Sequence, residues 1–410
     1  MAIIKSLLDV DFYKFTMGLL VFLKYRNIDV RYSFKCRTKD ANLMKIIKFE
    51  DLNRELAEVM KLKFNNSELH YLRGTNEYQE RMFCEEYLNF LKSLQLPKYD
   101  LQVEDYNLKL EFKGNWSEAI YWETIALSII NELYYQAQLK KMSAFERDVI
   151  FSQGMISLAE KIKILKSRPD IKFIEFGTRR RFSREWQDYV VSVLSNELPP
   201  SQFLGTSNTY LAMKYGLVPM GTSAHELYMA YTGIYRGSDD EIRASHNKSL
   251  QEWWDLYGFG LSVALTDTFG TDFFFRDMTA EQARNWKGLR QDSGDPIEFG
   301  EKAIKFYKNY GIDPREKLII FSDGLDIQTI IKIADHFQSR IKVSFGWGTN
   351  LTNDLGLKPL SMVIKLTEAN GNGTVKLSDN LAKAIGKPED VERFKRIFGH
   401  TVTLDEATTY

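Results

Sequence analysis

The stretch Lys317-Leu-Ile-Ile-Phe-Ser-Asp-Gly-Leu-Asp326 shows the pattern that decides the fold of this chain, because an apolar run ends abruptly in a polar turn with a glycine. The same pattern occurs seven times between about Ile171 and Asn350. Apolar strands that end in polar, glycine-containing turns are typical of parallel β/α barrels, whose active sites lie at the carboxyl-terminal ends of the strands. Seven such turns in one stretch therefore predict an enzyme that binds an anionic ligand.

The other six turns also carry Gly, Asp, Arg, Ser, Thr or His where an apolar run ends. They read Phe176-Gly-Thr-Arg-Arg-Arg, Leu204-Gly-Thr-Ser-Asn, Met220-Gly-Thr-Ser-Ala-His-Glu, Leu265-Thr-Asp-Thr-Phe-Gly-Thr-Asp, Leu289-Arg-Gln-Asp-Ser-Gly-Asp and Phe345-Gly-Trp-Gly-Thr-Asn. The strands are expected at 171–176, 202–205, 217–220, 262–266, 288–291, 317–322 and 341–346, and helical patterns follow most of them. Seven strand steps instead of eight predict an irregular, incomplete β/α barrel.

The chain on either side of this region has a different pattern. Strands are expected at 30–37, 101–104 and 108–114, and helices at 52–61, 78–92 and 120–141, without regular alternation. Such a mixture predicts an α/β sandwich. We expect a sandwich domain at 1–135, the barrel at 136–355, and a tail at 356–410 that packs back on the N-terminal domain.

Composition excludes several classes of protein. Lys+Arg and Asp+Glu both number 55, which argues against a nucleic-acid or membrane-surface partner. Two cysteines, Cys36 and Cys84, make neither a disulfide framework nor a metal cluster. No signal-peptide layout is present, and no apolar run approaches the roughly 20 residues of a membrane span, so we expect a cytoplasmic protein. Phosphate-loop, dinucleotide-binding and zinc-protease motifs are missing, which disfavours an ordinary kinase, dehydrogenase or zinc hydrolase.

His225 is the first candidate for chemistry. The turn Gly221-Thr-Ser-Ala-His-Glu opens a helix that Thr222 or Ser223 is expected to cap, and this puts His225 in the first helical turn. Helix N-termini attract anions, and a histidine there can act as an acid or base or accept a phosphoryl group, with Glu226 fixing its tautomer. The alternative is a surface histidine near a helix start, but a position at the rim of the barrel favours the site.

Charged clusters at the other strand ends suit a phosphorylated ligand. Four arginines follow one strand, and we expect one or two of them to touch ligand; they are Arg179, Arg180, Arg181 and Arg184. Six aspartates on three turns could supply Mg²⁺ ligands or helix caps; they are Asp267, Asp272, Asp292, Asp295, Asp323 and Asp326. Asp326 is the first candidate for a cap. The late turns at 322–324 and 346–349 are expected to bind phosphate through backbone amides.

Together these segments resemble the nicotinate phosphoribosyltransferase family nearly end to end. The opening Leu7-Leu-Asp-Val-Asp-Phe-Tyr-Lys-Phe-Thr-Met is similar to the first segment of that family. Internal signatures similar to its own are Phe176-Gly-Thr-Arg-Arg-Arg, Gly205-Thr-Ser-Asn, Gly221-Thr-Ser-Ala-His-Glu, Arg290-Gln-Asp-Ser-Gly-Asp-Pro, Ser344-Phe-Gly-Trp-Gly-Thr-Asn and, in the tail, Lys376-Leu-Ser-Asp. Their order and spacing make the resemblance strong, in particular to the bacterial and fungal branch.

The resemblance implies an activity. Nicotinate would attack the anomeric carbon of 5-phosphoribosyl 1-pyrophosphate and give nicotinate mononucleotide, a precursor of NAD, and pyrophosphate. ATP hydrolysis would be coupled to this reaction through a phosphohistidine, which matches His225, with Mg²⁺ as cofactor. Tyr13 matches a ring-stacking residue that reaches in from a neighbouring subunit in the family, which would require a homodimer with shared active sites.

The resemblance also implies roles for other residues. Phe176 would stack on the pyridine ring, and Thr206 and Ser207 would belong to the base pocket with Arg290 beside the ring. Ser207 stands where relatives that use nicotinamide carry an aspartate, so it favours nicotinate. Arg179 would lie near the phosphates. Asp267 and Asp292 would lie near the ribose and hold Mg²⁺. The 5′-phosphate turns would comprise Ser322, Gly324, Gly348 and Thr349.

Three alternatives compete with this interpretation. The nearest is a relative of the same fold that uses nicotinamide or quinolinate. A phosphate-binding barrel aldolase or isomerase is disfavoured because Schiff-base chemistry needs a lysine at a strand end, and the apolar strands offer none. A non-enzymatic ligand-binding protein is disfavoured because His225, Arg290 and Asp292 are all present.

Overall fold

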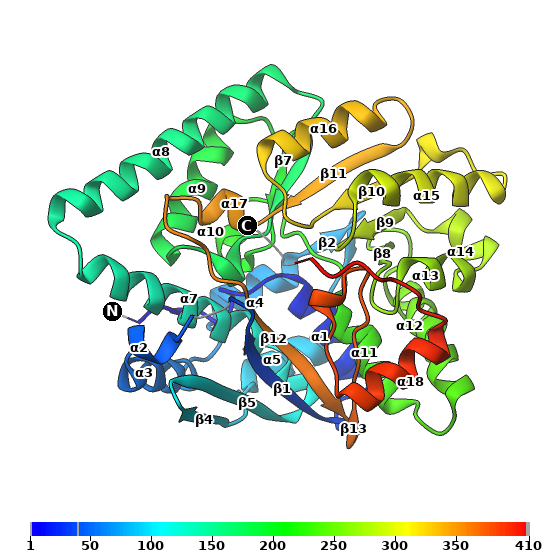
Figure 1. Ribbon diagram of the computed structural model, residues 1–410, viewed down its shortest axis with the longest axis horizontal. Helices are drawn as coiled ribbons and strands as arrows, with labels where there is room; N and C mark the ends of the chain where they lie inside the picture. The colour runs from blue at the N-terminus through cyan, green and yellow to red at the C-terminus, as the bar shows by residue number, and fades with distance from the viewer. Residues whose placement is uncertain (1, 39–40, 407–410) are drawn as a thin grey trace.

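Two β-sheets of different kinds organise the chain (Figure 1). The computed structural model describes residues 2–38 and 41–406. One sheet is antiparallel and the other is parallel, which confirms the predicted α/β class. A single apolar cluster runs through both parts, from Ile3 near the N-terminus to Phe398 near the end of the last helix.

The antiparallel sheet combines the first part of the chain with the tail. Its order is β13 (Asn372–Gly373), β12 (Met362–Ala369), β1 (Asp29–Cys36), β5 (Asn107–Asn115) and β4 (Tyr99–Glu104). β1 pairs with β12 from Val30 opposite Ala369 to Cys36 opposite Met362. In β5 the side chains alternate, and Leu108, Leu110 and Phe112 are buried, as expected for a sheet with one face on the core. The tail strand therefore lies in the same sheet as the N-terminal strands.

The parallel sheet has six strands and stays open. Its order is β7 (Phe203–Thr206), β6 (Phe173–Glu175), β11 (Lys342–Trp347), β10 (Leu318–Phe321), β9 (Gly288–Gln291) and β8 (Val263–Leu265). This order is cyclic in sequence, as in a β/α barrel, but no pairing between β7 and β8 closes it among the described residues. The expected seven-stranded incomplete barrel is thus a six-stranded open sheet.

The seventh expected strand, at 217–220, is only a bridge. Pro219 pairs with Thr206 as an isolated parallel bridge, and proline cannot donate the backbone hydrogen bond that a full ladder needs. Gly205 permits this approach: its φ is +143°, and a Cβ there would come within 2.2 Å of the Val218 carbonyl oxygen. The segment therefore lies against β7 without extending the sheet.

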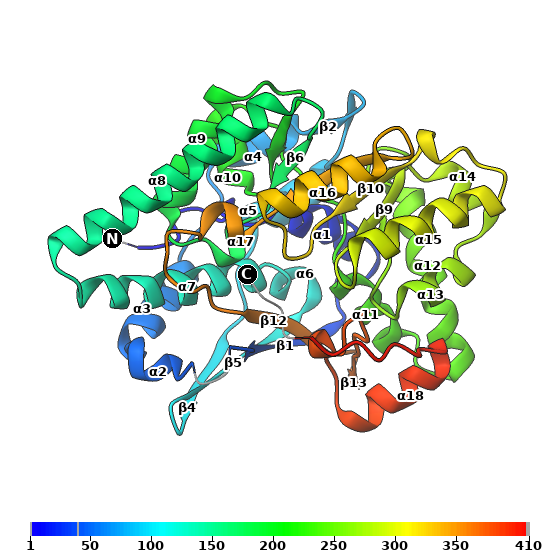
Figure 2. The ribbon, with the colours of Figure 1, turned by 45° about the horizontal axis from the view of Figure 1, so that its top comes forward.

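Helices pack around the parallel sheet and on one side of the antiparallel sheet (Figures 1 and 2). In the N-terminal part they are α1 (Tyr13–Lys24), α2 (Leu43–Ile46), α3 (Phe49–Val59), α4 (Asn66–Gly74), α5 (Glu85–Ser93), α6 (Trp116–Ala119) and α7 (Trp122–Lys140). Around the parallel sheet they are α8 (Ala144–Ser167), α9 (Arg184–Glu197), α10 (Thr209–Tyr215), α11 (His225–Ile234), α12 (Asp239–Tyr257), α13 (Thr271–Asp277), α14 (Ala280–Asn285), α15 (Pro296–Asn309), α16 (Ile327–Phe337) and α17 (Thr349–Thr352), and the tail adds α18 (Pro388–Phe398). α11 contacts β12 as well as α12, so it links the two halves of the molecule.

Local signals explain where several helices begin. Asp326 accepts a hydrogen bond from the Thr329 amide at 2.7 Å and caps α16, as predicted. Asp295 caps α15 in the same way, and Pro296 occupies its first turn. A capping box of Ser143 and Glu146 begins α8.

One expected helix differs from the structure. The helix expected at 78–92 is a short hairpin, β2 (Asn76–Glu77) and β3 (Glu80–Arg81), followed by α5. Tyr78 and Gln79 have positive φ values of 50° and 69°, which the tight turn between the two strands requires and a helix excludes. The long helix α12 begins at Asp239. Across residues 2–38 and 41–406, none of the helices has both the length and the apolar character of a membrane span.

Candidate active site

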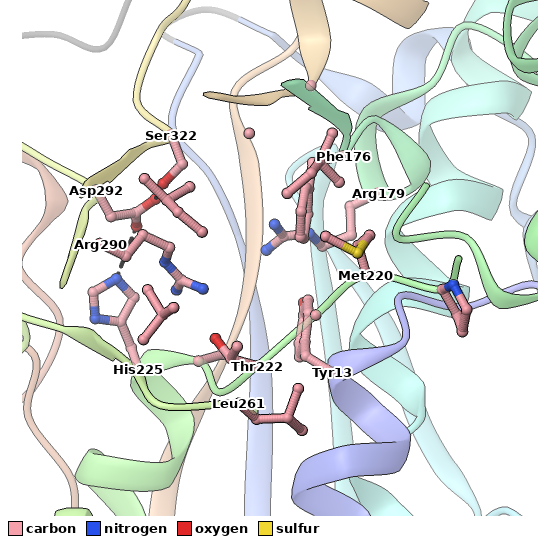
Figure 3. A pocket seen from close by; sticks show the side chains of 18 of the residues that line it. Tyr13, Phe176, Arg179, Met220, Thr222, His225, Leu261, Arg290, Asp292 and Ser322 are labelled. Atoms are coloured by element: carbon pink, nitrogen blue, oxygen red, sulfur yellow. Dashed lines mark hydrogen bonds and ion pairs between the residues drawn. The ribbon is translucent and has the colours of Figure 1, made fainter. Parts of the chain in front are cut away.

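A cavity of about 730 Å³ lies where the two sheets meet, and side chains from both line it. Strand ends of the parallel sheet contribute Phe176, Arg290 and Ser322, whereas the antiparallel sheet contributes Lys365 of β12. In Figure 3, Tyr13, Phe176 and Arg179 lie on one side of the cavity, and His225, Arg290 and Asp292 lie on the other.

Tyr13 and Phe176 give the cavity an aromatic side. Tyr13 is 3% exposed, and its hydroxyl group is buried without a hydrogen-bond partner. The guanidinium carbon of Arg179 lies 5.6 Å from the centre of the Tyr13 ring. Two aromatic rings beside a cation form a pocket that suits a flat, anionic ring.

Tyr13 belongs to the cavity of its own chain. The segment before it pairs with the turn after β7: the Phe12 amide donates to the Ser207 carbonyl at 2.7 Å, and the Thr209 amide donates to the Val10 carbonyl at 3.0 Å. This pairing brings the start of α1 to the parallel sheet. In this chain the second aromatic ring of the cavity is therefore its own Tyr13.

The four clustered arginines divide into two groups. Arg179 and Arg180 line the cavity. Arg181 is fully buried and donates to both carboxylate oxygens of Asp9, at 2.6 and 2.9 Å. Arg184 lies 3.4 Å from Asp9. Burial opposes ionisation of Asp9, but the Arg181 guanidinium holds the pKa of that carboxyl below its usual value.

Arg179 is itself held by two acidic residues, Asp11 behind the cavity wall and Glu123, which lines the cavity. Its Nε lies 3.2 Å from Asp11, and its Nη1 lies 3.7 Å from Glu123. Ser207, which was expected in the base pocket, donates instead to the other oxygen of Asp11 at 2.7 Å and does not line the cavity. Thr206 also lies outside the cavity, because its hydroxyl group donates to the buried Glu175 at 2.5 Å.

His225 stands at the first residue of α11 and faces two polar groups. Its Nε2 lies 2.8 Å from Asp292 Oδ2, and its Nδ1 lies 2.9 Å from Thr268 Oγ1. Burial and then the positive charge of Lys376 lower the pKa of His225 to about 4, against the opposing charges of Asp267 and Asp292. The imidazole is therefore neutral near pH 7. Burial alone would raise the pKa of Asp292, but its contact with His225 holds that pKa well below the usual value.

Asp267 and Asp292 form an acidic pair beside the imidazole. Ser293 donates to Asp267 Oδ2 at 2.6 Å, whereas Asp267 Oδ1 is buried without a hydrogen-bond partner. One oxygen of each carboxylate and one nitrogen of His225 lie within 4.8 Å of one another. Such a set of donors fits a divalent cation that prefers carboxylate oxygens.

Two predictions for the start of α11 are wrong: Glu226 was expected to fix the tautomer of His225, and Thr222 or Ser223 was expected to cap the helix. Glu226 points away from the cavity, where Lys14, Tyr32 and Trp116 donate to its carboxylate. It does not orient His225, whose partners are Thr268 and Asp292. The residue before α11 is Ala224, so no side chain caps this helix.

The late turns, which were expected to bind phosphate, lie at the cavity. Ser322, Gly324, Gly348 and Thr349 all line it. The Ser322 hydroxyl group lies 2.9 Å from the Gln291 carbonyl oxygen and 3.1 Å from Asp292, so it ties this turn to the acidic pair. Asp323 in the same turn is paired with Lys383 at 2.5 Å.

The opposite wall of the cavity carries a set of cations that the sequence patterns did not predict. Four basic side chains line it, one just after β1, one in β12 and two in the tail; they are Arg37, Lys365, Lys376 and Lys383. Burial, the largest cause, lowers the pKa of Lys365 to about 8, although the contact of its Nζ with Glu123 at 3.0 Å opposes the shift. Only Lys376 belongs to a segment with a recognisable signature, since the other three stand in the sequence without a motif.

Comparisons with known proteins agree along the chain. The model of the nicotinate phosphoribosyltransferase (NAPRTase) family matches residues 171–402, and the model of the NAPRTase N-terminal domain matches residues 8–131. A solved nicotinate phosphoribosyltransferase from Vibrio cholerae is 32% identical, with a TM-score of 0.87 over 98% of this chain and 95% of that chain. Another, from Porphyromonas gingivalis, is 31% identical, with a TM-score of 0.85 over 97% of this chain and 100% of that chain.

Proposed function

Because the chain belongs to the nicotinate phosphoribosyltransferase family, we propose that it transfers the phosphoribosyl group of 5-phosphoribosyl 1-pyrophosphate to nicotinate, coupled to ATP hydrolysis. The observation that carries this proposal is a single cavity lined by two aromatic rings, a neutral buried histidine and four cations from the opposite sheet and tail. This combination suits a flat anionic base, a phosphoryl acceptor and a polyphosphate in one space.

Nicotinate binds between Tyr13 and Phe176 in this proposal. Arg179 and Arg290 supply positive charge for its carboxylate. Arg290 donates from Nη1 to the Ser223 carbonyl at 3.0 Å, whereas its Nε is buried without a hydrogen-bond partner. A buried donor without a partner costs free energy, which a carboxylate acceptor would recover. Ser207 acts on the base only indirectly, through Asp11 and Arg179.

The phosphoribosyl donor occupies the rest of the cavity. Arg37, Lys365, Lys376 and Lys383 face its pyrophosphate, and backbone amides of the turns at 322–324 and 346–349 hold its 5′-phosphate. The pyridine nitrogen of nicotinate forms a bond to the anomeric carbon as the bond from that carbon to pyrophosphate breaks, and the electron pair leaves with pyrophosphate. Asp267 and Asp292 stabilise the positive charge that develops on the ribose.

The acidic pair also fits Mg²⁺. Asp267 and Asp292 would hold the ion, and the unpartnered buried Oδ1 of Asp267 is a free ligand position. When bound, Mg²⁺ neutralises phosphate charge and orients the pyrophosphate leaving group.

His225 accepts the γ-phosphoryl group of ATP in this proposal. Because Asp292 is ionised, the neutral imidazole donates from Nε2 to that carboxylate and accepts at Nδ1 from Thr268 Oγ1. Attack by Nε2 requires the other neutral tautomer, so the proton must move from Nε2 to Nδ1, where it is donated to Thr268, before phosphoryl transfer. The bond from Nε2 to phosphorus forms as the bond from phosphorus to the leaving oxygen of ADP breaks. Hydrolysis of the phosphohistidine then returns the enzyme and releases phosphate.

Steady-state assays with nicotinate, nicotinamide and quinolinate test the base, each with phosphoribosyl pyrophosphate and with or without ATP. We expect nicotinate mononucleotide to form fastest, and ATP to accelerate it. Preferential use of nicotinamide or quinolinate would overturn the assignment of the substrate. Incubation with γ-labelled ATP should label the wild type but not His225→Ala, and an unlabelled wild type under turnover would rule out the phosphohistidine.

A further inference from the structure

The first turn of α1 packs directly on the segment that leads into α11. Thr16 donates to the Thr222 carbonyl at 2.7 Å, and the Ala224 amide lies 3.3 Å from the sulfur of Met17. Gly221 approaches so closely that a Cβ there would lie 2.6 Å from the Tyr13 amide nitrogen. The start of α1, which carries Tyr13, and the start of α11, which carries His225, therefore form one packed unit.

Lys14 adds the charged link in this unit. Its side chain is fully buried, with its Nζ 2.5 Å from Glu226 and 2.7 Å from Glu123. The other oxygen of Glu226 accepts hydrogen bonds from Tyr32 at 2.6 Å and Trp116 at 3.1 Å. A buried ammonium group costs several kcal/mol of desolvation unless its partners are well placed, so these contacts hold the groups in one arrangement.

The link joins the residues that immediately follow the two functional side chains. Lys14 follows Tyr13 in α1, and Glu226 follows His225 in α11. Neighbouring residues in the first turn of a helix share a rigid backbone. A shift of Glu226 relative to Lys14 therefore changes the separation between the aromatic ring and the imidazole. Glu123 extends the network to Arg179 and Lys365, which both line the cavity.

We propose that Lys14 is a positioning residue that fixes the aromatic base pocket relative to His225 through the buried Lys14–Glu226 ion pair, and thereby sets how much ATP is consumed for each nucleotide formed. The inference rests on the proposed function, because it assigns phosphoryl transfer to His225. Lys14 touches neither the base nor the phosphates in this scheme: it acts through Tyr13 and His225. When the ion pair is lost, the phosphohistidine at His225 forms and is hydrolysed while the imidazole is no longer aligned with the base pocket. ATP is then consumed without forming nucleotide.

The test compares full-length Lys14→Met, Glu226→Gln and the double variant with Lys317→Met as the matched control. Lys317 is also a buried lysine, whose Nζ binds the carbonyl oxygens of Arg284 and Trp286 at 2.6 and 2.7 Å outside the cavity. We expect ATP consumed per nucleotide to rise about fivefold in both single variants, which corresponds to about 1 kcal/mol at 1.4 kcal/mol per factor of ten. Lys317→Met should keep the wild-type ratio even where its melting temperature falls.

The double variant separates positioning from stability. In Lys14→Met the Glu226 carboxylate is buried without its cation, whereas the double variant has neither charge. The melting temperature of the double variant should therefore lie above that of Lys14→Met. The raised ratio of ATP consumed to nucleotide formed should persist in the double variant. A ratio that returns to the wild-type value together with stability would overturn the inference, as would an equal rise in Lys317→Met. If Lys14→Met does not fold, Glu226→Gln decides the outcome, because glutamine keeps the shape of the side chain.

A failure of the proposed function would look different. A wild type that forms the nucleotide at the same rate without ATP removes the phosphohistidine from the scheme. The positioning role of Lys14 is then tested by kcat/KM for nicotinate in the same variants. A fall of about tenfold in Lys14→Met, with less than about twofold in Lys317→Met, supports it. Equal falls in the two variants overturn it.

Discussion

Arg181→Met should destabilise the protein strongly although Arg181 lies outside the cavity. The guanidinium group is fully buried and makes two hydrogen bonds to Asp9, whose side chain is 2% exposed. Methionine fills much of the same space but leaves the Asp9 carboxylate buried without its cation. The remaining partners of Asp9 are the Asn208 amide at 2.7 Å and Arg184 at 3.4 Å, and neither replaces a bidentate pair.

The size of the effect follows from the burial of the pair. Removing one partner of a buried ion pair costs about 3–5 kcal/mol. Unfolding entropy near the midpoint is about 2.1 cal/mol/K per residue, so a chain of 410 residues that unfolds as one unit has an entropy of about 0.86 kcal/mol/K. Dividing the free-energy cost by this entropy gives an expected fall in melting temperature of about 3.5–6 °C.

Thermal unfolding followed by circular dichroism measures this shift, with Arg315→Met as the control. Arg315 makes the same kind of bidentate contact with Asp313, but at the surface, where its side chain is 72% exposed. Surface pairs contribute little, so its melting temperature should stay unchanged. Asp9→Asn combined with Arg181→Met should melt higher than Arg181→Met alone. Equal shifts for the two arginine variants, or no recovery in the double variant, would refute the reasoning.

Three further predictions concern the cavity. In Mg²⁺-free protein, ¹³C-histidine NMR should give His225 a midpoint near 4, and a midpoint near 6.5 would contradict the observed burial. Because this pKa lies below the usual 6.5, the unfolded chain takes up the proton at a higher pH than the folded chain does. The free energy of unfolding of the wild type should therefore fall, relative to that of His225→Asn, by about 3 kcal/mol as the pH drops from 6.5 to 4. Ser207→Ala should change the preference for nicotinate over nicotinamide by less than about tenfold, or 1.4 kcal/mol, because Ser207 lies behind the cavity wall; a larger change in the ratio of kcat/KM values would show that it meets the base directly. Lys383→Met should raise KM for phosphoribosyl pyrophosphate about tenfold, since it removes a cation from the cavity wall, and an unchanged KM would exclude Lys383 from binding.

Patterns local in sequence predicted the parts of the fold that depend on neighbouring residues. Apolar runs that end in glycine-containing turns identified the strands of the parallel sheet and the turns that line the cavity, among them the turn of Ser322 and Gly324. The cap at Asp326 followed from the same kind of local signal. Backbone hydrogen bonding and the periodicity of burial act over a few residues, so a single sequence carries them.

Tertiary structure alone decided which charged and polar side chains face the cavity. Ser207 and Glu226 stand in signature segments, yet both turn away because buried partners hold them: Asp11 for Ser207, and Lys14, which lies 212 positions from Glu226, for the glutamate. Lys365 and Lys383 reach the cavity only because β12 pairs with β1 and brings the tail across the parallel sheet. The free energy of a buried charge depends on partners that folding brings from distant segments, and no spacing along the chain records those partners.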